Sequence, residues 1–393
     1  MFSINRKMSV WTLYLRLICS VLPARGRTPC SHLANRVLPA RDRTPCSHLA
    51  NRVLPVRVNA LCLLLAVMAL PARSQTGGDN TYEFLNLSHS AYATATGGIT
   101  VSQGRNDLSL PYFNPALLNS NMDNSVSLSF STWLAGIRYG YASYAMDTER
   151  MGTFAGGVSF ISHGRFTEAD QAGNITGSFT AAEYGFNILW SMEIDSSFTA
   201  GINLKPVLSH LERYFSAGIC MDIGASYHNE ALLLDAGLVI RNAGFQIRSY
   251  TGQGGEPLPF EIIAGATKRL AHAPFSFSLT VRHLEKPDMT YDYDTEDDNM
   301  PGGFGDDLLR HLVFGAELIP SESFWIGAGL NYQRRAEMRT DQRTGMAGFT
   351  AGFGIRLKAF ELAWGYDSFH PAGGASHFTL TLRPEKIFGN TPE

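Results

Sequence analysis

Residues 347–367 read AGFTAGFGIRLKAFELAWGYD, and this stretch decides the fold class. An apolar side chain occupies every second position, and Gly, Thr or a charged residue occupies most of the positions between them. A period of two is the period of a β-strand, in which successive side chains point to opposite faces. We therefore predict two strands here, each with one apolar face, joined by a tight turn at residues 358–359.

The same alternation recurs from Ser125 onward. Most of the alternating segments span about 8–12 residues, close to the roughly 9–11 residues of a tilted membrane strand. We therefore predict an all-β fold, a 14-stranded antiparallel transmembrane barrel over residues 125–383, with a tail at 384–393. The fourteen segments begin near Ser125, Gly136, Gly152, Phe179, Phe198, Ser216, Leu232, Phe260, Phe275, His311, Phe324, Met346, Phe360 and Ser376.

Connection lengths alternate along the chain. The short connections are 147–151, 195–197, 229–231, 270–274, 320–323 and 358–359. The long, polar ones are 163–178, 209–215, 244–259, 285–310 and 334–345. Short turns at one rim and long loops at the other are typical of an outer-membrane barrel, whereas a soluble sandwich has no reason to sort its loops in this way. An even number of strands also places both chain ends at the short-turn rim.

The second face of the strands carries Gly, Ser, Thr and charges of both signs. A Lys or Arg facing lipid at mid-bilayer would cost ~2–4 kcal/mol, so we expect this face to line the lumen. Mixed signs favour pairing inside the lumen over an ion-selective ring. The charged residues are Arg138, Glu183, Lys205, Asp222, Asp235, Glu261, Arg282, Glu317, Arg356 and Asp367.

Composition excludes several classes of protein. Charged residues make up 17% of the chain, and Gly, Phe and Tyr are frequent, which argues against disorder. A formal net charge of −3 without a long Lys/Arg block argues against nucleic-acid binding. After residue 74 the only cysteine is Cys220, which rules out an intramolecular disulfide framework there and suggests a packing role.

The first 74 residues differ from the rest. Residues 21–36 and 37–52 are copies that differ only at Gly26 and Asp42, and we hypothesise that residues 1–52 are not part of the native product. Residues 53–74 have a basic start, an apolar run at 60–70 and small residues before a cleavage point after Ser74, which predicts a signal peptide.

Residues 75–124 lack strand periodicity and precede the first strand. Asn114 followed by Pro115 suits the start of a short helix with Asn114 as its cap. A fourteen-stranded lumen lined with glycine has room for such a segment. We therefore predict a short helical N-terminal plug or lid over residues 75–124.

Motifs spread over residues 77–382 resemble the barrel group that includes the FadL fatty-acid channels and the PorV and PorQ proteins of type IX secretion. The shared opening comprises Gly77-Gly78, Tyr82-Glu83-Phe84-Leu85, Ser90-Ala91, Gly97-Gly98 and Asn114-Pro115-Ala116. The longer match, to the PorQ family, adds His163-Gly164-Arg165-Phe166, Asp170, Gly173, Gly177-Ser178-Phe179, Glu183-Tyr184, Asn203-Leu204-Lys205-Pro206, Leu258-Pro259-Phe260-Glu261-Ile262, Leu270-Ala271-His272-Ala273-Pro274-Phe275, Arg334-Arg335 and His370-Pro371-Ala372-Gly373.

The resemblance implies a FadL-like barrel in the cell outer membrane, surrounded by lipid, with its long loops facing the cell surface. It implies a non-enzymatic role in type IX secretion. In the attachment complex a PorQ-type barrel holds a PorZ-type surface protein beside the PorU sortase and the PorV shuttle. Tyr92 departs from the family pattern, in which we expect Arg, and this puts a salt bridge from that plug position in doubt.

No motif predicts a catalytic, cofactor or metal site. The histidines of the mature chain are scattered, and nothing marks Ser368 and His370 as a catalytic pair. The acidic segment 285–310 lacks the Gly and the final Glu of an EF-hand, so we interpret it as a solvated loop rather than a calcium site, with partner docking about equally favoured. Its acidic residues are Glu285, Asp288, Asp292, Asp294, Glu296, Asp297, Asp298, Asp306 and Asp307.

The rival hypothesis is a transporter of hydrophobic ligands, by analogy with FadL. It requires an apolar path through the lumen and a gap in the wall. The polar lumen face disfavours such a path. Pro206, which offers no N–H to a neighbouring strand, could mark such a gap.

Overall fold

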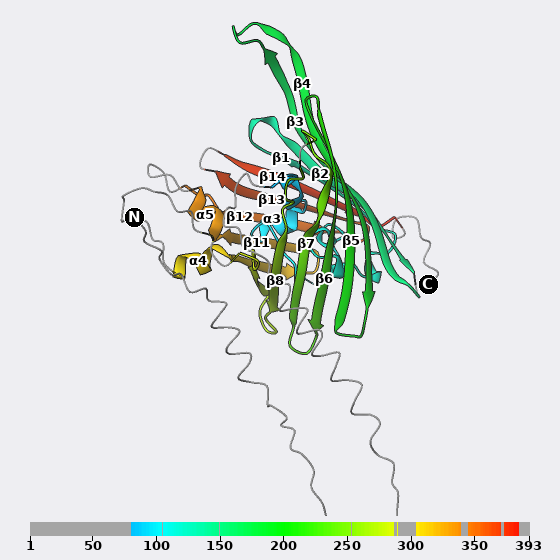
Figure 1. Ribbon diagram of the computed structural model, residues 1–393. Coiled ribbons are helices and arrows are strands. Elements are labelled where there is room, and N and C mark those ends of the chain that lie inside the picture. The colour runs from blue at the N-terminus through cyan, green and yellow to red at the C-terminus, as the bar shows by residue number, and fades with distance from the viewer. Residues whose placement is uncertain are drawn as a thin grey trace, which may run out of the picture. The chain divides into compact units, whose positions relative to one another are not determined.

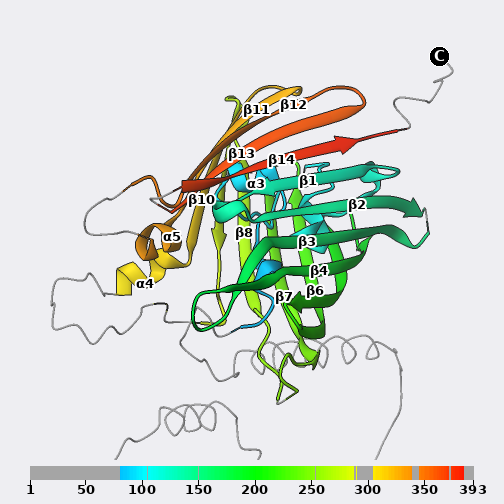
Figure 2. The same ribbon diagram turned by 90° about the horizontal axis from the view of Figure 1, so that it is seen from above.

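The computed structural model describes residues 80–103, 105–148, 150–252, 254–286, 289, 304–338, 345–370 and 373–384. These residues belong to one compact unit that begins at Ala66. They form a closed barrel of fourteen antiparallel strands in which neighbours in sequence pair and the first strand closes against the last (Figures 1 and 2). The predicted fold class is therefore confirmed. The predictions for residues 1–52 and 53–74, and for the tail beyond residue 384, lie outside the described residues.

Each strand begins within four residues of its predicted start. The strands are β1 (Val126–Thr132), β2 (Arg138–Thr148), β3 (Gly152–Ala169), β4 (Ile175–Glu193), β5 (Phe198–Leu211), β6 (Tyr214–Asn229), β7 (Leu234–Arg248), β8 (Glu261–Arg269), β9 (Phe275–Val281), β10 (Leu312–Ser321), β11 (Phe324–Asn331), β12 (Phe349–Arg356), β13 (Phe360–His370) and β14 (Gly373–Leu382).

Alternation sorts the side chains between the two faces of the wall. On β1, Leu128 and Phe130 are 45% and 42% exposed, whereas Ser127 and Ser129, which alternate with them, are buried. The same sorting recurs around the barrel and leaves a broad apolar outer surface. A surface of this kind is stable against hydrocarbon and costly in water. None of the helices among the described residues has the length and apolarity that crossing a membrane requires.

One predicted lumen charge lies on the other face. Arg138 is exposed at the first position of β2, and its neighbour Tyr139 is the residue that points inward. Arg138 pairs with Thr132, the last residue of β1, so it sits at the rim. A charge on the outer face costs little there, because the cost falls from mid-bilayer to the interface. The prediction for Arg138 was therefore wrong.

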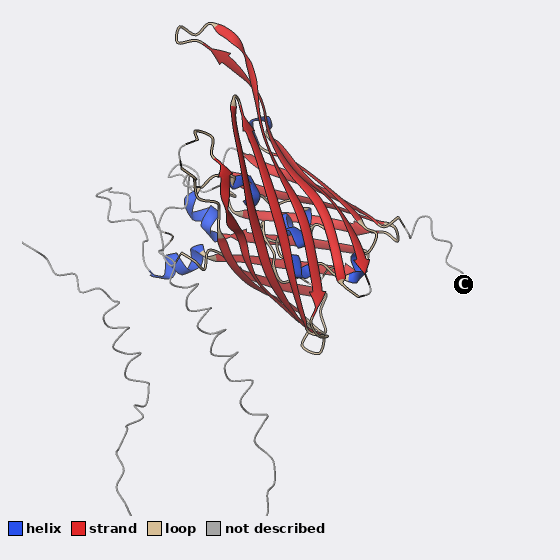
Figure 3. Cartoon of the chain, turned by 45° about the vertical axis from the view of Figure 1, so that its right-hand side comes forward, coloured by secondary structure: helices blue, strands red, loops and turns tan. Residues whose placement is uncertain are grey.

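Two segments predicted as long loops are mostly strand. β3 and β4 continue beyond the barrel as a projecting hairpin that turns at residues 170–174 (Figures 1 and 3). At its turn, hydrogen bonds from Asn174 lower the pKa of the Asp170 carboxyl. The connection at 209–215 shrinks to a turn at Glu212 and Arg213. The apolar alternation ends where β3 and β4 extend beyond the barrel wall, although backbone pairing continues.

Two further predicted loops contain short helices at the same rim. These are α4 (Phe304–Arg310), at the end of the 285–310 segment, and α5 (Tyr332–Glu337), which follows β11. Asp306 joins them, since it accepts hydrogen bonds from Arg310 Nε at 2.8 Å and from the Tyr332 hydroxyl at 2.9 Å. Most of the acidic segment lies outside the described residues.

The described residues before β1, 80–103 and 105–125, lie inside the barrel (Figures 1 and 2). They form η1 (Glu83–Asn86), α3 (Ala91–Ala95), η2 (Leu110–Tyr112), η3 (Pro115–Leu117) and η4 (Ser120–Met122). Asn114 caps η3 as predicted, because its side-chain oxygen accepts a hydrogen bond from Ala116 N at 3.0 Å. We call residues 80–124 the plug.

Candidate functional site

The plug rests directly on glycines of the barrel wall. A Cβ atom added to Gly224, Gly237 or Gly329 would come closer than 3.0 Å to Asn114 Oδ1, Val101 O or Gly97 N, respectively. These glycines are needed because plug atoms occupy the space of a side chain. Asn114 also donates to Val101 O at 2.8 Å and to Ala225 O of the wall at 3.3 Å. The plug and the wall therefore share one buried core, as the packing of α3 against β12 and β13 also indicates.

A buried ion pair lies on the wall beside η1. Lys205 Nζ is 2.7 Å from Asp222 Oδ1, and both side chains are fully buried. Asn203 and the backbone N–H of Asn242 also donate to the Asp222 carboxylate. The predicted internal pairing of lumen charges is confirmed here and at Arg282–Glu261, Arg334–Asp367 and Arg356–Glu361.

A β-bulge on β7 connects this ion pair to the plug. The register between β6 and β7 shifts at Arg241 and Asn242, and both consecutive side chains are fully buried. Arg241 donates to Leu85 O at 3.0 Å, and Asn242 Nδ2 donates to Asn86 Oδ1 at 3.1 Å. Sequence reasoning missed both residues, because a period of two allows only one of two neighbours to face inward. The local sequence signal for the bulge is the asparagine at position 242. Asn242 has a φ of 54°, and asparagine tolerates this left-handed region of backbone conformation.

The wall keeps its strand register at Pro206. Pairing of β5 with β4 drops out beside this proline but resumes in the same register, with Gly185 opposite Val207 and Ile188 opposite Leu204. Pairing of β5 with β6 is continuous there. The lumen side at this point is the Lys205–Asp222 pair, which is polar. The rival's requirement for an apolar path is therefore not met beside Pro206.

Tyr92 of the plug contacts a buried acid of the wall, Glu317. Its hydroxyl donates to Glu317 Oε2 at 3.1 Å, and Arg105 forms an ion pair with the same carboxylate. The Arg105 guanidinium stacks 4.6 Å from the centre of the Tyr92 ring. A plug cation therefore does reach the wall, but it comes from Arg105 rather than from position 92.

Tyr92→Phe should lower the free energy of unfolding by about 1–2 kcal/mol, because one hydrogen bond to a carboxylate is lost while the ion pair stays. The folded fraction in urea, measured by the heat-modifiable gel shift of the barrel, checks this. A loss of more than about 3 kcal/mol would mean that the hydroxyl, not Arg105, holds Glu317.

A cavity of about 310 Å³ opens between the plug and the long-loop rim. Asn86 of the plug lines it together with Trp133, Arg282, Arg334 and Phe369 of the wall and its loops. Arg334 stacks on Phe369, with 4.4 Å between its guanidinium carbon and the ring centre. The lining mixes aromatic and charged groups, so the cavity offers a polar recess rather than an apolar channel.

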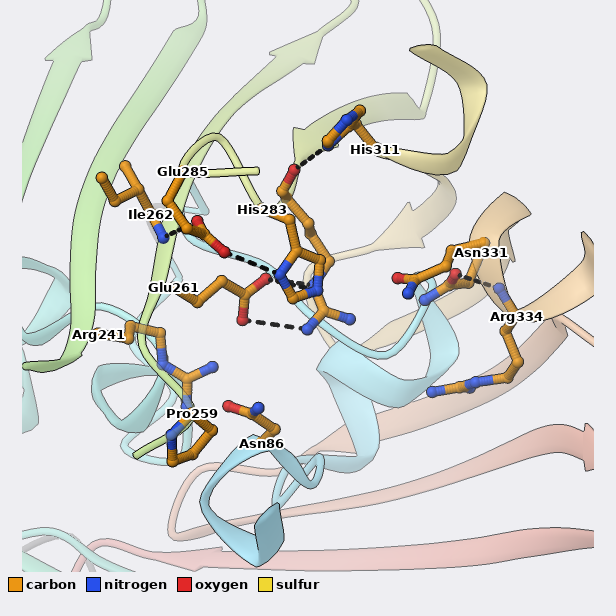
Figure 4. A network of polar contacts seen from close by, with 12 residues as sticks. Asn86, Arg241, Pro259, Glu261, Ile262, His283, Glu285, His311, Asn331 and Arg334 are labelled. Carbon is orange, nitrogen blue, oxygen red and sulfur yellow. Dashed lines mark hydrogen bonds and ion pairs between the residues drawn. The ribbon is translucent and has the colours of Figure 1, made fainter. Parts of the chain in front are cut away.

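The base of the acidic segment is fixed at this cavity (Figure 4). The His283 ring lies between two carboxylates, 3.5 Å from Glu261 and 3.1 Å from Glu285. Glu285 also accepts the backbone N–H of Ile262 at 2.8 Å, and His311 Nδ1 is 2.7 Å from Arg282 O. Both ends of the β9–β10 connection are thus held to the barrel mouth.

The structure brings together no metal-ligand group among the described residues: nowhere in them do three His, Cys, Asp or Glu side chains gather as a metal ion would need. Cys220 is buried in the wall, where burial suits a packing role. Ser368 and His370 lie at the end of β13, at the long-loop rim, and the backbone carbonyl of Ser368 accepts the Gly348 N–H at 2.9 Å.

Comparisons with known proteins find likeness at the level of solved structures. No protein-family model matches the chain, and no curated protein matches it. The toluene transporter TbuX of Ralstonia pickettii shares 11% identity with a TM-score of 0.45, covering 76% of this chain and 98% of that one. The toluene transporter TodX of Pseudomonas putida gives 10%, 0.44, 75% and 96%, and the monoaromatic hydrocarbon channel CymD gives 12%, 0.43, 77% and 97%. These distant likenesses assign no ligand and no partner to this chain.

Proposed function

We propose that this chain is a closed outer-membrane barrel that anchors a surface partner for protein secretion. The observation that supports this most is the plug, which fills the lumen and is held by close contacts with wall glycines and by the buried Arg105–Glu317 ion pair. A barrel filled in this way is suited to holding a partner rather than to passing a solute. The PorQ-like motifs favour type IX secretion, with a PorZ-type surface protein as partner and the PorU and PorV proteins reached through it.

The partner would dock at the long-loop rim, which we place at the cell surface. The β3–β4 hairpin, the helices α4 and α5 and the fixed base of the acidic segment all lie at this rim. Phe166 and Phe179 stack on the exposed hairpin with 5.1 Å between ring centres. Beyond Ser162, none of the described strands pairs with the other side of β3, which leaves backbone groups for a partner to bind.

The alternative, a transporter of hydrophobic ligands, keeps one favourable observation. The barrel carries an N-terminal segment inside its lumen, and a path would open if this segment moved. The buried Arg105–Glu317 ion pair makes such movement costly, because Arg105 of the plug would have to leave Glu317 of the wall behind.

A hairpin-trimmed variant tests the anchor. Ser162 and Ala182 are directly paired, so an Asn-Gly turn can replace residues 163–181 and close the shortened hairpin. We expect this variant to fold, as judged by the gel shift, and to recover far less surface protein in a pull-down from intact outer membranes. A matched variant with residues 287–303 replaced by a Gly-Ser linker measures how much the acidic segment contributes to recovery of the surface protein. If wild type and both variants all fail to recover a surface protein, and a bound hydrophobic molecule is found instead, the transporter is favoured.

A further inference from the structure

A second cavity, of about 360 Å³, lies at the short-turn rim. Plug and wall line it together: Arg105 and Asn106 come from the plug, and Arg269, Trp325 and Arg356 come from strands β8, β11 and β12. Three of these five residues are arginines. The plug separates this cavity from the one at the long-loop rim. Neither partner docking nor ligand entry at the long-loop rim therefore involves it.

Two of the arginines are held side by side. Glu361 Oε2 accepts a hydrogen bond from Arg356 Nε at 2.8 Å, and Glu361 Oε1 lies 3.9 Å from Arg105 Nη2. Arg105 Nη1 pairs with Glu317 on its other side, and its guanidinium stacks 5.3 Å from the Trp325 ring centre. Both guanidinium planes are therefore fixed before any ligand arrives, which reduces the entropy cost of binding.

Both guanidiniums keep an unused donor. Arg105 Nε and Arg356 Nη2 are buried, and neither has a hydrogen-bond partner among the described residues. The Arg105 side chain is only 10% exposed, so bulk water has little access to it. Buried donors without partners are rare, and each that occurs points to a bound water, ion or ligand.

Further positive charge stands at the same place. Arg269, an exposed residue at the end of β8, also lines the cavity. Arg383 donates to Asn106 O at 2.9 Å, which places a fourth guanidinium next to the cavity. The acids nearby are Glu317 and Glu361, which already pair with Arg105 and Arg356, and Glu322 in the β10–β11 turn, which lines the cavity. The buried Asp107 of the plug also interacts electrostatically with Arg105 and Glu361.

We propose that this cavity binds a phosphate group. Guanidinium N–H donors match phosphate oxygens in spacing and charge, and a tetrahedral oxyanion accepts from several donors at once. The cavity is lined by three arginines, Arg105 of the plug and Arg269 and Arg356 of two wall strands. Two sources share this chemistry: free phosphate, and the headgroup of a phospholipid. The headgroup fits because the cavity lies where the strands end, which is the level of the membrane interface.

Titration calorimetry with inorganic phosphate, on the full barrel in a phosphate-free detergent, tests the free-anion source. Arg356→Gln combined with Glu361→Gln removes the donor without leaving a carboxylate unpaired. We expect this double variant to bind phosphate at least roughly tenfold more weakly than wild type. Arg213→Gln, which changes an exposed arginine at the opposite rim, is the matched control and should bind like wild type.

Native mass spectrometry of barrels reconstituted in phosphatidylglycerol nanodiscs and then released tests the headgroup source. Phospholipid retained by wild type and by Arg213→Gln, but lost from the double variant, supports a headgroup site even if inorganic phosphate does not bind. The gel shift of the double variant confirms that it is folded. If wild type binds neither inorganic phosphate nor phospholipid more tightly than the folded double variant does, the cavity holds water only and the proposal is overturned.

Discussion

Valine at Gly237 is expected to dislodge the plug from the lumen. A Cβ atom at this position would overlap Val101 O, and the strand cannot retreat because β7 pairs with β6 and β8 on either side at this point. Overpacking of a core typically costs about 1–3 kcal/mol, and we expect the upper end because the two nearest atoms that the new Cβ would overlap, Val101 O and C, belong to the backbone. The lower urea midpoint of the gel shift measures the loss, and new ionic current across a planar bilayer reports the unseated plug.

Gly156→Val is the matched control for this change. Gly156 lies on β3, on the exposed outer face of the wall, and an added Cβ atom would meet nothing within 4 Å. Valine there should leave stability and current unchanged. If Gly237→Val and Gly156→Val behave alike, the plug does not rest on the wall at Val101.

Asp222→Ala should lower the free energy of unfolding by about 3–5 kcal/mol, because it leaves the Lys205 ammonium buried without its counter-charge. It also removes the acceptor of the Asn242 N–H, which holds the β-bulge that positions η1. Urea unfolding followed by the gel shift gives the magnitude. Replacing both partners, with Lys205→Met and Asp222→Leu, should recover much of the loss, because no charge is then left unpaired.

Glu212→Ala is the control for Asp222→Ala. It breaks the Glu212–Arg213 pair, in which the Arg213 side chain is 72% exposed, and exposed pairs contribute little. We expect no measurable change in its urea midpoint. An Asp222→Ala barrel as stable as this control would mean that water reaches Lys205 and that the lumen is not closed there.

The strands could be predicted from the sequence because each wall residue has two possible environments, lipid or lumen. Apolar alternation such as Phe349, Phe353 and Ile355 on one face of β12 records that choice residue by residue. Prediction from apolar alternation fails where a residue faces neither lipid nor lumen. The outer half of the β3–β4 hairpin meets neither environment, so its pairing continues without alternation.

The contacts of the plug could be predicted only in outline. The Asn114 cap follows from local chemistry, and it was found. The pairing of Arg105 with Glu317 joins residues far apart in the sequence, and no periodicity in the plug points to it. The inward turn of both Arg241 and Asn242 depends on a bulge that breaks the period of two. In each case the tertiary partner, rather than local pattern, decides where the side chain points.

The current carried by the wild-type barrel across a planar bilayer tests most directly whether the plug closes the lumen. The account predicts no stepwise current above that of the bare membrane for wild type, with the Gly237→Val barrel as the conducting reference. Stable current steps from the wild-type barrel, equal to those of Gly237→Val, would contradict it.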